Sequence, residues 1–274
     1  MQSQLLHIFR NTPLGRETLL QSIYFCRQVD AAPVVYIPRF TKFLMYFEND
    51  VVQVDLDGSY LTAPDTALEH ATALIEAAGL EFRLFEPKNF TASTLPDLPA
   101  NFDFMCCPRS IGDLASKIGL GYIGPRVRRI VNSARFPVLI TGSVFKPWNS
   151  VAVFFGGSAN AIHALRLGFR VGRLSNLPVD VFTFGERDFE VYRSIVAEAG
   201  LTEDVDARVR EWRFFGDRPL EESLYEIPHD ALCVAGAFGH GLIKNMVFGS
   251  TVERIQGILT NNLLIVGPNY AAHT

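Results

Sequence analysis

The sequence predicts an α/β protein made of two similar units, each with a mainly parallel five-stranded sheet covered by helices. Three observations favour this fold class. Short apolar segments alternate with amphipathic ones along most of the 274 residues. The same succession of segments occurs twice, in the same order. The length also suits two units of roughly 100 to 150 residues each.

The internal repeat joins four pairs of segments. They are "PVVYIPR" (33–39) with "PVDVFTF" (178–184), "IEAAGLEFRLF" (75–85) with "VAEAGL" (196–201) and "EWRFF" (211–215), "DFMCC" (103–107) with "DALCV" (230–234), and "VRRIVNSARFPVLI" (127–140) with "VERIQGILTNNLLI" (252–265). We therefore place the units at 1–145 and 146–274. The final strands, "PVLITG" and "NLLIVG", are the expected contact edges of an internal pseudo-dimer, and a further homodimer is compatible with the sequence.

The second unit is the clearer copy. Its expected strands are "SVAVFF" (150–155), "VDVFTF" (179–184), "EWRFF" (211–215), "DALCVAG" (230–236) and "NLLIVG" (262–267). Its expected helices are 159–172, 187–200 with Gly200 closing the C-terminus, a short one around 220–227, and 251–259. The first unit differs by an insertion near 43–62, where alternating apolar residues and a "DLDG" turn signal predict a hairpin.

A glycine-rich loop, "GAFGHGLIKNMVFGS" (236–250), follows the fourth strand of the second unit. Ligands of open parallel sheets bind beyond the carboxyl ends of the strands, where this loop begins. Gly249 and Ser250 directly precede a predicted helix, whose unpaired N–H groups and dipole favour an anion. The spacing G-x2-G-x9-G-S is neither a P-loop nor a GxGxxG fingerprint. The loop therefore predicts a phosphate site, unless it is only a glycine turn at a helix start.

This spacing, "GSTVERI" and the repeated five-strand unit resemble the universal stress protein family in its tandem form. The resemblance implies two Rossmann-like (adenine nucleotide alpha hydrolase-like) units with strand order 3-2-1-4-5. It also implies that the second unit binds ATP, with or without Mg²⁺, in a stress-response regulatory protein. The expected nucleotide-binding residues are Gly156, Gly157, Ser158, Phe184 through its main chain, Ala235, Gly236, Gly239, His240, Gly249, Ser250 and Thr251.

Two departures from the family pattern concern the adenine and ribose end. The family commonly has an aspartate after the first strand, where this chain has Gly156, Gly157 and Ser158. It also commonly has a histidine before the second glycine, where Phe238 stands here, with His240 after that glycine. Phosphate binding is therefore better supported than adenine recognition.

The first unit replaces most of the motif with arginines. Aligning the units places Arg10 opposite Gly156, Arg39 opposite Phe184, Arg109 opposite Gly236 and Arg126 opposite Thr251. These four guanidinium groups either fill a disused pocket with their heads in solvent, or converge on an anion such as a phosphorylated metabolite.

Composition excludes several function classes. A net charge of −4 with interspersed signs gives no basis for nucleic-acid or membrane binding. No run approaches the roughly 18 apolar residues of a membrane span, the first residues lack a secretion signal, and the four cysteines show no CxxC spacing, so we expect a cytoplasmic protein with reduced thiols.

No set of residues has the spacing of a known catalytic or metal-binding motif. Three function classes fit the sequence. The first is a nucleotide-binding regulatory protein, and the second an interaction protein of the same fold that binds no nucleotide. The third is an ATP-splitting enzyme, which the faint similarity of "FFGGSAN" (154–160) to the SGGxDS loop of ATP pyrophosphatases allows.

Overall fold

The computed structural model describes residues 2–56, 63–91, 95–111, 123–185, 187–216, 218–237 and 259–271. In the first half, the elements of the repeated unit are β1 (Ser3–Ile8), α1 (Pro13–Val29), β2 (Ala31–Tyr36), α2 (Pro64–Ala77), β5 (Arg83–Leu84), β8 (Phe104–Pro108), α3 (Pro125–Ser133) and β9 (Val138–Thr141). The insertion adds β3 (Lys42–Tyr46), β4 (Val51–Asp55), β6 (Phe90–Thr91) and β7 (Leu95–Pro99).

The second half follows the predicted succession, with one additional short helix at 202–208 that was not predicted. Its elements are β10 (Ser150–Phe154), α4 (Ala159–Ser175), β11 (Val179–Thr183), α5 (Phe189–Glu198), α6 (Thr202–Arg208), β12 (Val209–Phe214), α7 (Leu220–Leu224), β13 (Ala231–Gly236) and β14 (Leu263–Val266). Gly200 lies at φ +68° just after α5, as expected of a glycine that closes a helix. The predicted helix at 251–259 falls largely outside the described residues.

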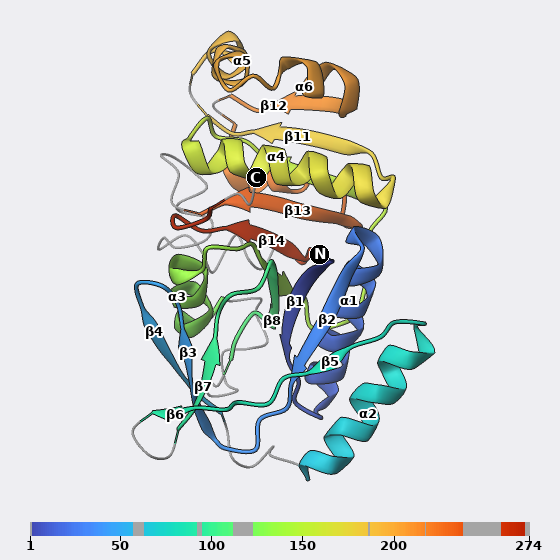
Figure 1. Cartoon of the computed structure of the whole chain (residues 1–274). Helices are drawn as coiled ribbons and strands as arrows, with labels where there is room; N and C mark the ends of the chain where they lie inside the picture. Colours follow the sequence, from blue (N-terminus) through green and yellow to red (C-terminus); the bar gives the residue numbers. More distant parts are fainter. Residues whose placement is uncertain are drawn as a thin grey trace.

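The two halves form one ten-stranded sheet rather than two separate ones. Its order is β12-β11-β10-β13-β14-β9-β8-β1-β2-β5, so the strands of each half lie 3-2-1-4-5 when they are numbered along that half. All neighbours within a half are parallel. This arrangement gives the α/β, mostly parallel fold class that the sequence predicts (Figure 1).

The halves meet through their final strands. β14 pairs antiparallel with β9, with Leu264 opposite Leu139 and Ile265 opposite Val138. Both strands are fully buried. The two strands that the sequence named as contact edges therefore join the halves by a backbone ladder, and Figure 1 shows β14 next to the blue and green elements of the first half.

The first helix of each half shows how closely the two copies agree. Helices α1 and α4 both have 17 residues. Each begins after a side-chain cap, in which Thr12 or Ser158 accepts a hydrogen bond from a backbone N–H of the first turn. Each ends at a left-handed residue, Asp30 or Asn176. Such residues tolerate this conformation better than most, so the sequence encodes both helix ends locally.

The insertion forms a second, four-stranded sheet of order β4-β3-β7-β6. β3 and β4 make the predicted hairpin, but its turn lies at Phe47–Asp50, where the Phe47 N–H donates to the Asp50 carbonyl at 2.9 Å. The "DLDG" signal instead starts at the end of β4, and residues 57–62 lie outside the described part. This small sheet lies beside α3 (Figure 1).

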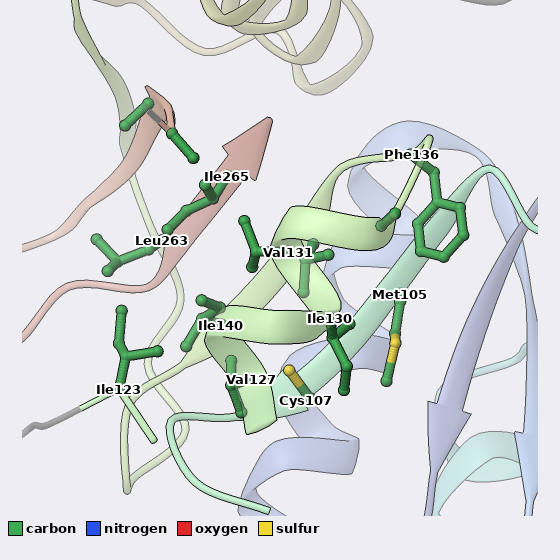
Figure 2. Packing of buried hydrophobic residues seen from close by; sticks show 14 of the residues in the cluster. Met105, Cys107, Ile123, Val127, Ile130, Val131, Phe136, Ile140, Leu263 and Ile265 are labelled. Carbon is green, nitrogen blue, oxygen red and sulfur yellow. The ribbon is translucent and has the colours of Figure 1, made fainter. Parts of the chain in front are cut away.

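Each face of the large sheet has its own core. Beneath α1 and α4, residues such as Phe25 and Leu165 pack on the strands. On the opposite face, Val127, Ile130 and Val131 of α3 pack near Met105 and Cys107, and Ile140, Leu263 and Ile265 continue this cluster into the second half (Figure 2). The same cores thus cross the junction between the halves. No helix in the described part is long and apolar enough to span a membrane.

Candidate functional site

The candidate site lies at the carboxyl ends of β10 and β13, two neighbours at the centre of the second half. β13 ends at Gly236, and β10 leads through Gly156 and Gly157 to α4. A Cβ atom at Gly236 would lie 2.5 Å from the backbone carbon and oxygen of Asn160. Only glycine permits this approach, so the two glycine segments that the sequence selected separately lie against each other.

The turn before α4 is fixed by its own residues. Gly157 has φ +73°, a conformation that side chains disfavour, and a Cβ there would lie 2.9 Å from Ile195 Cδ1. Ser158 caps α4 by accepting a hydrogen bond from the Ala161 N–H at 3.2 Å. The Ser158 hydroxyl therefore has a structural role independent of any ligand.

Asn160 is a residue that the motif search missed. Its side-chain Nδ2 donates to the carbonyl oxygen of Ala237 at 2.6 Å. This bond ties the first turn of α4 to Ala237, the second residue of the glycine-rich loop. The sequence shows only an asparagine two residues after the cap. Its role cannot be inferred without knowing that the loop after β13 lies beside it.

Phe184 follows β11 and is 6% exposed. Its ring stacks on Phe215 with centroids 5.0 Å apart and meets Phe154 edge-on at 5.7 Å. The side chain therefore belongs to the core, and only the main chain at this strand end is available for the role that the resemblance implies. Ala235 is likewise buried, within β13.

Five expected site residues, Gly239, His240, Gly249, Ser250 and Thr251, lie outside the described residues. Their part in the site remains a prediction.

The four arginines of the first half have different surroundings. Arg109 is 8% exposed, and its Nη2 donates to the carbonyls of Leu259 and Asn261 at 2.9 and 2.8 Å. Burial lowers the pKa of this guanidinium to about 10. Arg126 pairs with Asp55, Nη2 to Oδ2, at 2.9 Å. Two of the four charges thus already face protein oxygen atoms, which weighs against the interpretation as one shared anion site.

Arg10 and Arg39 line two different cavities. The Arg10 cavity, of about 80 Å³, lies at the carboxyl ends of β1 and β8 beside the first turn of α1. It is the first-half counterpart of the candidate site. Leu56 from the inserted hairpin lines it, 6% exposed, next to the Asp55 that pairs with Arg126. The insertion therefore contributes one wall residue to this cavity.

The strand ladders shift two of the arginine correspondences by one residue. Leu5 pairs with Pro33 and Phe104, while its counterpart Val151 pairs with Val179 and Leu232. Arg39 therefore corresponds to Gly185 rather than Phe184, and Arg109 to Ala237 rather than Gly236. The pairing of Arg10 with Gly156 holds, because each lies two residues before the cap of its helix, Thr12 of α1 or Ser158 of α4. The alignment of the two halves by their apolar residues was therefore one residue out of register in the strands before Arg39 and Arg109.

The buried thiols offer no nucleophile. Cys26, Cys106, Cys107 and Cys233 are free and buried, and desolvation raises the pKa of each. Within the described ranges, no group of three or more His, Cys, Asp or Glu side chains could hold a metal ion.

Comparison with known proteins agrees with this architecture. The chain is 25% identical over 200 residues to the universal stress protein Slr1230 of Synechocystis sp., a match that spans 69% of this chain and 66%, slightly under two thirds, of that protein. The crystal structure of a universal stress protein from Archaeoglobus fulgidus superposes with a TM-score of 0.65 at 16% identity, covering 97% of this chain and 99% of the other.

Two further solved structures share the fold. A Pseudomonas aeruginosa protein provisionally named a universal stress protein matches with a TM-score of 0.59 at 12% identity, over 98% of this chain and 94% of that one. The cytoplasmic domain of a prokaryotic cation chloride cotransporter matches with a TM-score of 0.52 at 11% identity, over 97% and 95% of the two chains. No family model matches the sequence.

Fold and site together define a tandem Rossmann-like α/β protein with a glycine-lined strand edge in its second half. The sequence match adds that the chain is a homologue of the universal stress protein Slr1230. The resemblance drawn from the motif spacing is confirmed.

Proposed function

We propose that this protein is a stress-response regulatory protein of the cytoplasm that binds ATP in its second half. The observation that carries the proposal is the close approach of Gly236 to Asn160, where any side chain at position 236 would collide with backbone. It brings the start of the G-x2-G-x9-G-S loop and the glycine turn before α4 to one strand edge, the usual ligand position in open α/β sheets.

The residues present suit the phosphates of a nucleotide. Small residues border the strand edge, and Gly249 with Ser250 would supply N–H groups and a hydroxyl at the predicted helix start. Adenine would contact the main chain after β11, where Phe184 and Gly185 follow the last strand residue. Mg²⁺ would enter with the phosphates, because it is commonly bound by them with few protein ligands.

A second candidate is an interaction protein of the same fold that binds no nucleotide. It is favoured by the missing aspartate after β10, where Gly156 and Gly157 stand, and by the first half, whose equivalent position the insertion lines with Leu56. The similar fold in the cytoplasmic domain of a transporter is an example of this architecture inside a larger protein.

Isothermal titration of the purified chain with ATP and Mg²⁺ separates these candidates. We expect saturable binding to one site per chain. Gly249→Val should abolish it, because a branched side chain would occupy the phosphate position. The control is Gly124→Ala, the equivalent residue of the first half, where φ is −63°, a backbone conformation that any residue adopts; it should leave binding unchanged. Unaltered affinity in Gly249→Val would exclude this loop as the site.

Analysis of the products after prolonged incubation with ATP tests the remaining enzymatic alternative. A nucleotide-binding regulator should return ATP largely intact. AMP and pyrophosphate formed in equal amounts, and in excess over the protein, would instead identify an ATP-splitting enzyme.

A further inference from the structure

A second cavity lies in the first half, at the carboxyl ends of β2 and β5. It has a volume of about 250 Å³ and is bounded by the first turns of α2 and by the inserted strands β6 and β7. Its walls are mostly apolar and include three prolines, Pro64, Pro87 and Pro96. Proline fixes its own φ, so these three positions have restricted backbone freedom.

The floor of this cavity is apolar and its rim is aromatic. Tyr36 is 2% exposed, and its ring is held edge-on by Phe43 and Phe85 at 5.3 and 6.3 Å. At the rim, Phe40 and Phe90 are 46% and 48% exposed and contact each other edge-to-face at 6.1 Å. Two large rings kept in solvent beside a concave apolar surface are typical of a binding site.

Three charged side chains also line the cavity: Arg39, Asp65 and Glu86. All three are exposed, and none of them forms a hydrogen bond or ion pair with another residue of the described ranges. The carboxylates of the adjacent insertion differ, since Glu48, Asp50 and Asp55 all pair with arginines. The Tyr36 hydroxyl likewise has no hydrogen-bond partner among the described residues, although the residue is almost fully buried.

The second half has aromatic rings where the first half opens this cavity. At the ends of β11 and β12, Phe184 and Phe215 stack on each other and are each 6% exposed. In the first half, Arg39 and Phe40 after β2 are exposed, and the inserted strands close the far side. The cavity is therefore a property of the first half and is separate from the proposed nucleotide site.

We propose that this cavity binds a small zwitterion with an apolar or aromatic body, of the class of free α-amino acids. Arg39 would bind its carboxylate, Asp65 and Glu86 its ammonium group, and Phe40 and Phe90 its side chain. The cavity volume lies just below the range of about 300 to 1,000 Å³ that suits drug-sized ligands, so the ligand is small. Charges of both signs around one apolar cavity favour a zwitterion over a simple anion.

Isothermal titration of the full chain tests this with L-phenylalanine as the probe. Three analogues each lack one feature: 2-phenylethylamine has no carboxylate, 3-phenylpropanoate no ammonium group, and glycine no ring. We expect L-phenylalanine to bind with a Kd of about 1 mM or below, and each analogue at least about fivefold more weakly. ATP should not compete, so this result is independent of nucleotide binding. No heat of binding, or an analogue that binds as well as phenylalanine, overturns the proposal.

Variants assign the two charged ends. Arg39→Gln should weaken the binding of L-phenylalanine about fivefold to tenfold. It should leave the affinity for 2-phenylethylamine unchanged, because this amine has no carboxylate for Arg39 to bind. Asp65→Asn combined with Glu86→Gln should weaken the binding of L-phenylalanine and of 2-phenylethylamine. It should leave the affinity for 3-phenylpropanoate unchanged. The control variants, Arg27→Gln on α1 and Glu76→Gln on α2, change exposed charges outside the cavity and should have no effect. Equal binding by all variants contradicts the assignment.

Discussion

Arg109 of the first half donates from Nη2 to the carbonyl oxygen of Asn261 in the second half, at 2.8 Å, and also to that of Leu259. The guanidinium is buried at the junction, where Asn261 itself donates to the carbonyls of Pro228 and Ala231. The sequence predicts that this guanidinium either fills a disused pocket or binds an anion, but in the structure it bonds the first half to the second.

Replacing Arg109 should destabilise the fold. Arg109→Met removes both hydrogen bonds and leaves two carbonyls at the junction without this donor. We expect the free energy of unfolding to fall by about 2–3 kcal/mol in urea denaturation. Arg27→Met, at an exposed position of α1, is the control and should change it by less than about 0.5 kcal/mol. A small loss in Arg109→Met would mean that the junction does not depend on this side chain.

Gly236→Ala should destabilise the second half. The added Cβ would lie 2.5 Å from the Asn160 carbonyl, which is backbone and cannot rotate away. Overpacking of this kind typically costs about 1–3 kcal/mol, measurable by chemical denaturation. Gly200→Asn is the comparison: φ is +68°, no atom lies within 4 Å of its Cβ position, and asparagine tolerates this conformation. Similar losses in both variants would show that the effect is general to these glycines.

Folding stability should decrease in mild acid because of His7. This residue in β1 is fully buried, its Nδ1 lies 2.7 Å from Ser22 Oγ, and desolvation lowers its pKa from 6.5 to about 3. Between these values only the unfolded chain binds the proton, so stability is complete above pH 6.5 and falls as the pH decreases towards 3.

Between pH 7.5 and 5.5 this residue alone should remove about 1.4 kcal/mol from the free energy of unfolding, as measured by urea titration at both values. His7→Gln cannot titrate and should show a correspondingly smaller difference. A variant with the same pH dependence as the natural chain would assign the effect to other groups.

The inserted hairpin is anchored to α3 by Asp50, which sits in its turn. Its carboxylate accepts from Arg129 Nε and Nη2 at 3.0 and 2.7 Å and from Ser133 Oγ at 2.6 Å. The Arg129 and Ser133 hydrogen bonds hold the pKa of Asp50 well below its usual value. Asp50→Asn should therefore weaken the attachment of β3 and β4.

Hydrogen exchange measures this directly. We expect faster exchange of the β3 and β4 amides in Asp50→Asn, with a global loss of only about 1 kcal/mol because the pair is partly solvated. Amides of β13 in the other half should be unaffected. Glu76→Gln, an exposed carboxylate at the end of α2, is the control. Unchanged exchange in β3 and β4 would show that apolar packing alone holds the hairpin.

The regular elements were largely predictable because their signals are local. The caps Thr12 and Ser158, the glycine after α5 and the apolar runs of β13 and β14 all lie within the segments that they define. β6 and β7 were not predicted. The segment 86–102 has little alternation and three prolines, and β7 is a strand because it pairs in parallel with β3, some 50 residues earlier.

The position of the candidate site at the strand ends could be predicted from the sequence, but the contacts of its long side chains could not. Gly157 and Gly236 could be found from the sequence, because a positive φ at the first and a close approach to backbone at the second both require glycine. The contacts of Arg109 and Arg126 could not be predicted, since each depends on a partner far away in the sequence. The partner of Arg109 is the 259–261 segment, and that of Arg126 is Asp55. Long side chains reach in many directions, and only the folded chain selects one.

The ladder between β9 and β14 has a consequence for how the protein responds to dilution. Two separate copies of such a unit would dissociate once their concentration fell below the dissociation constant of the pair. Here the linker at 142–149 makes the same contact intramolecular, at an effective concentration that no dilution can reduce. The midpoint of unfolding of this junction should therefore be independent of protein concentration, and the two halves can diverge in sequence while remaining permanently assembled.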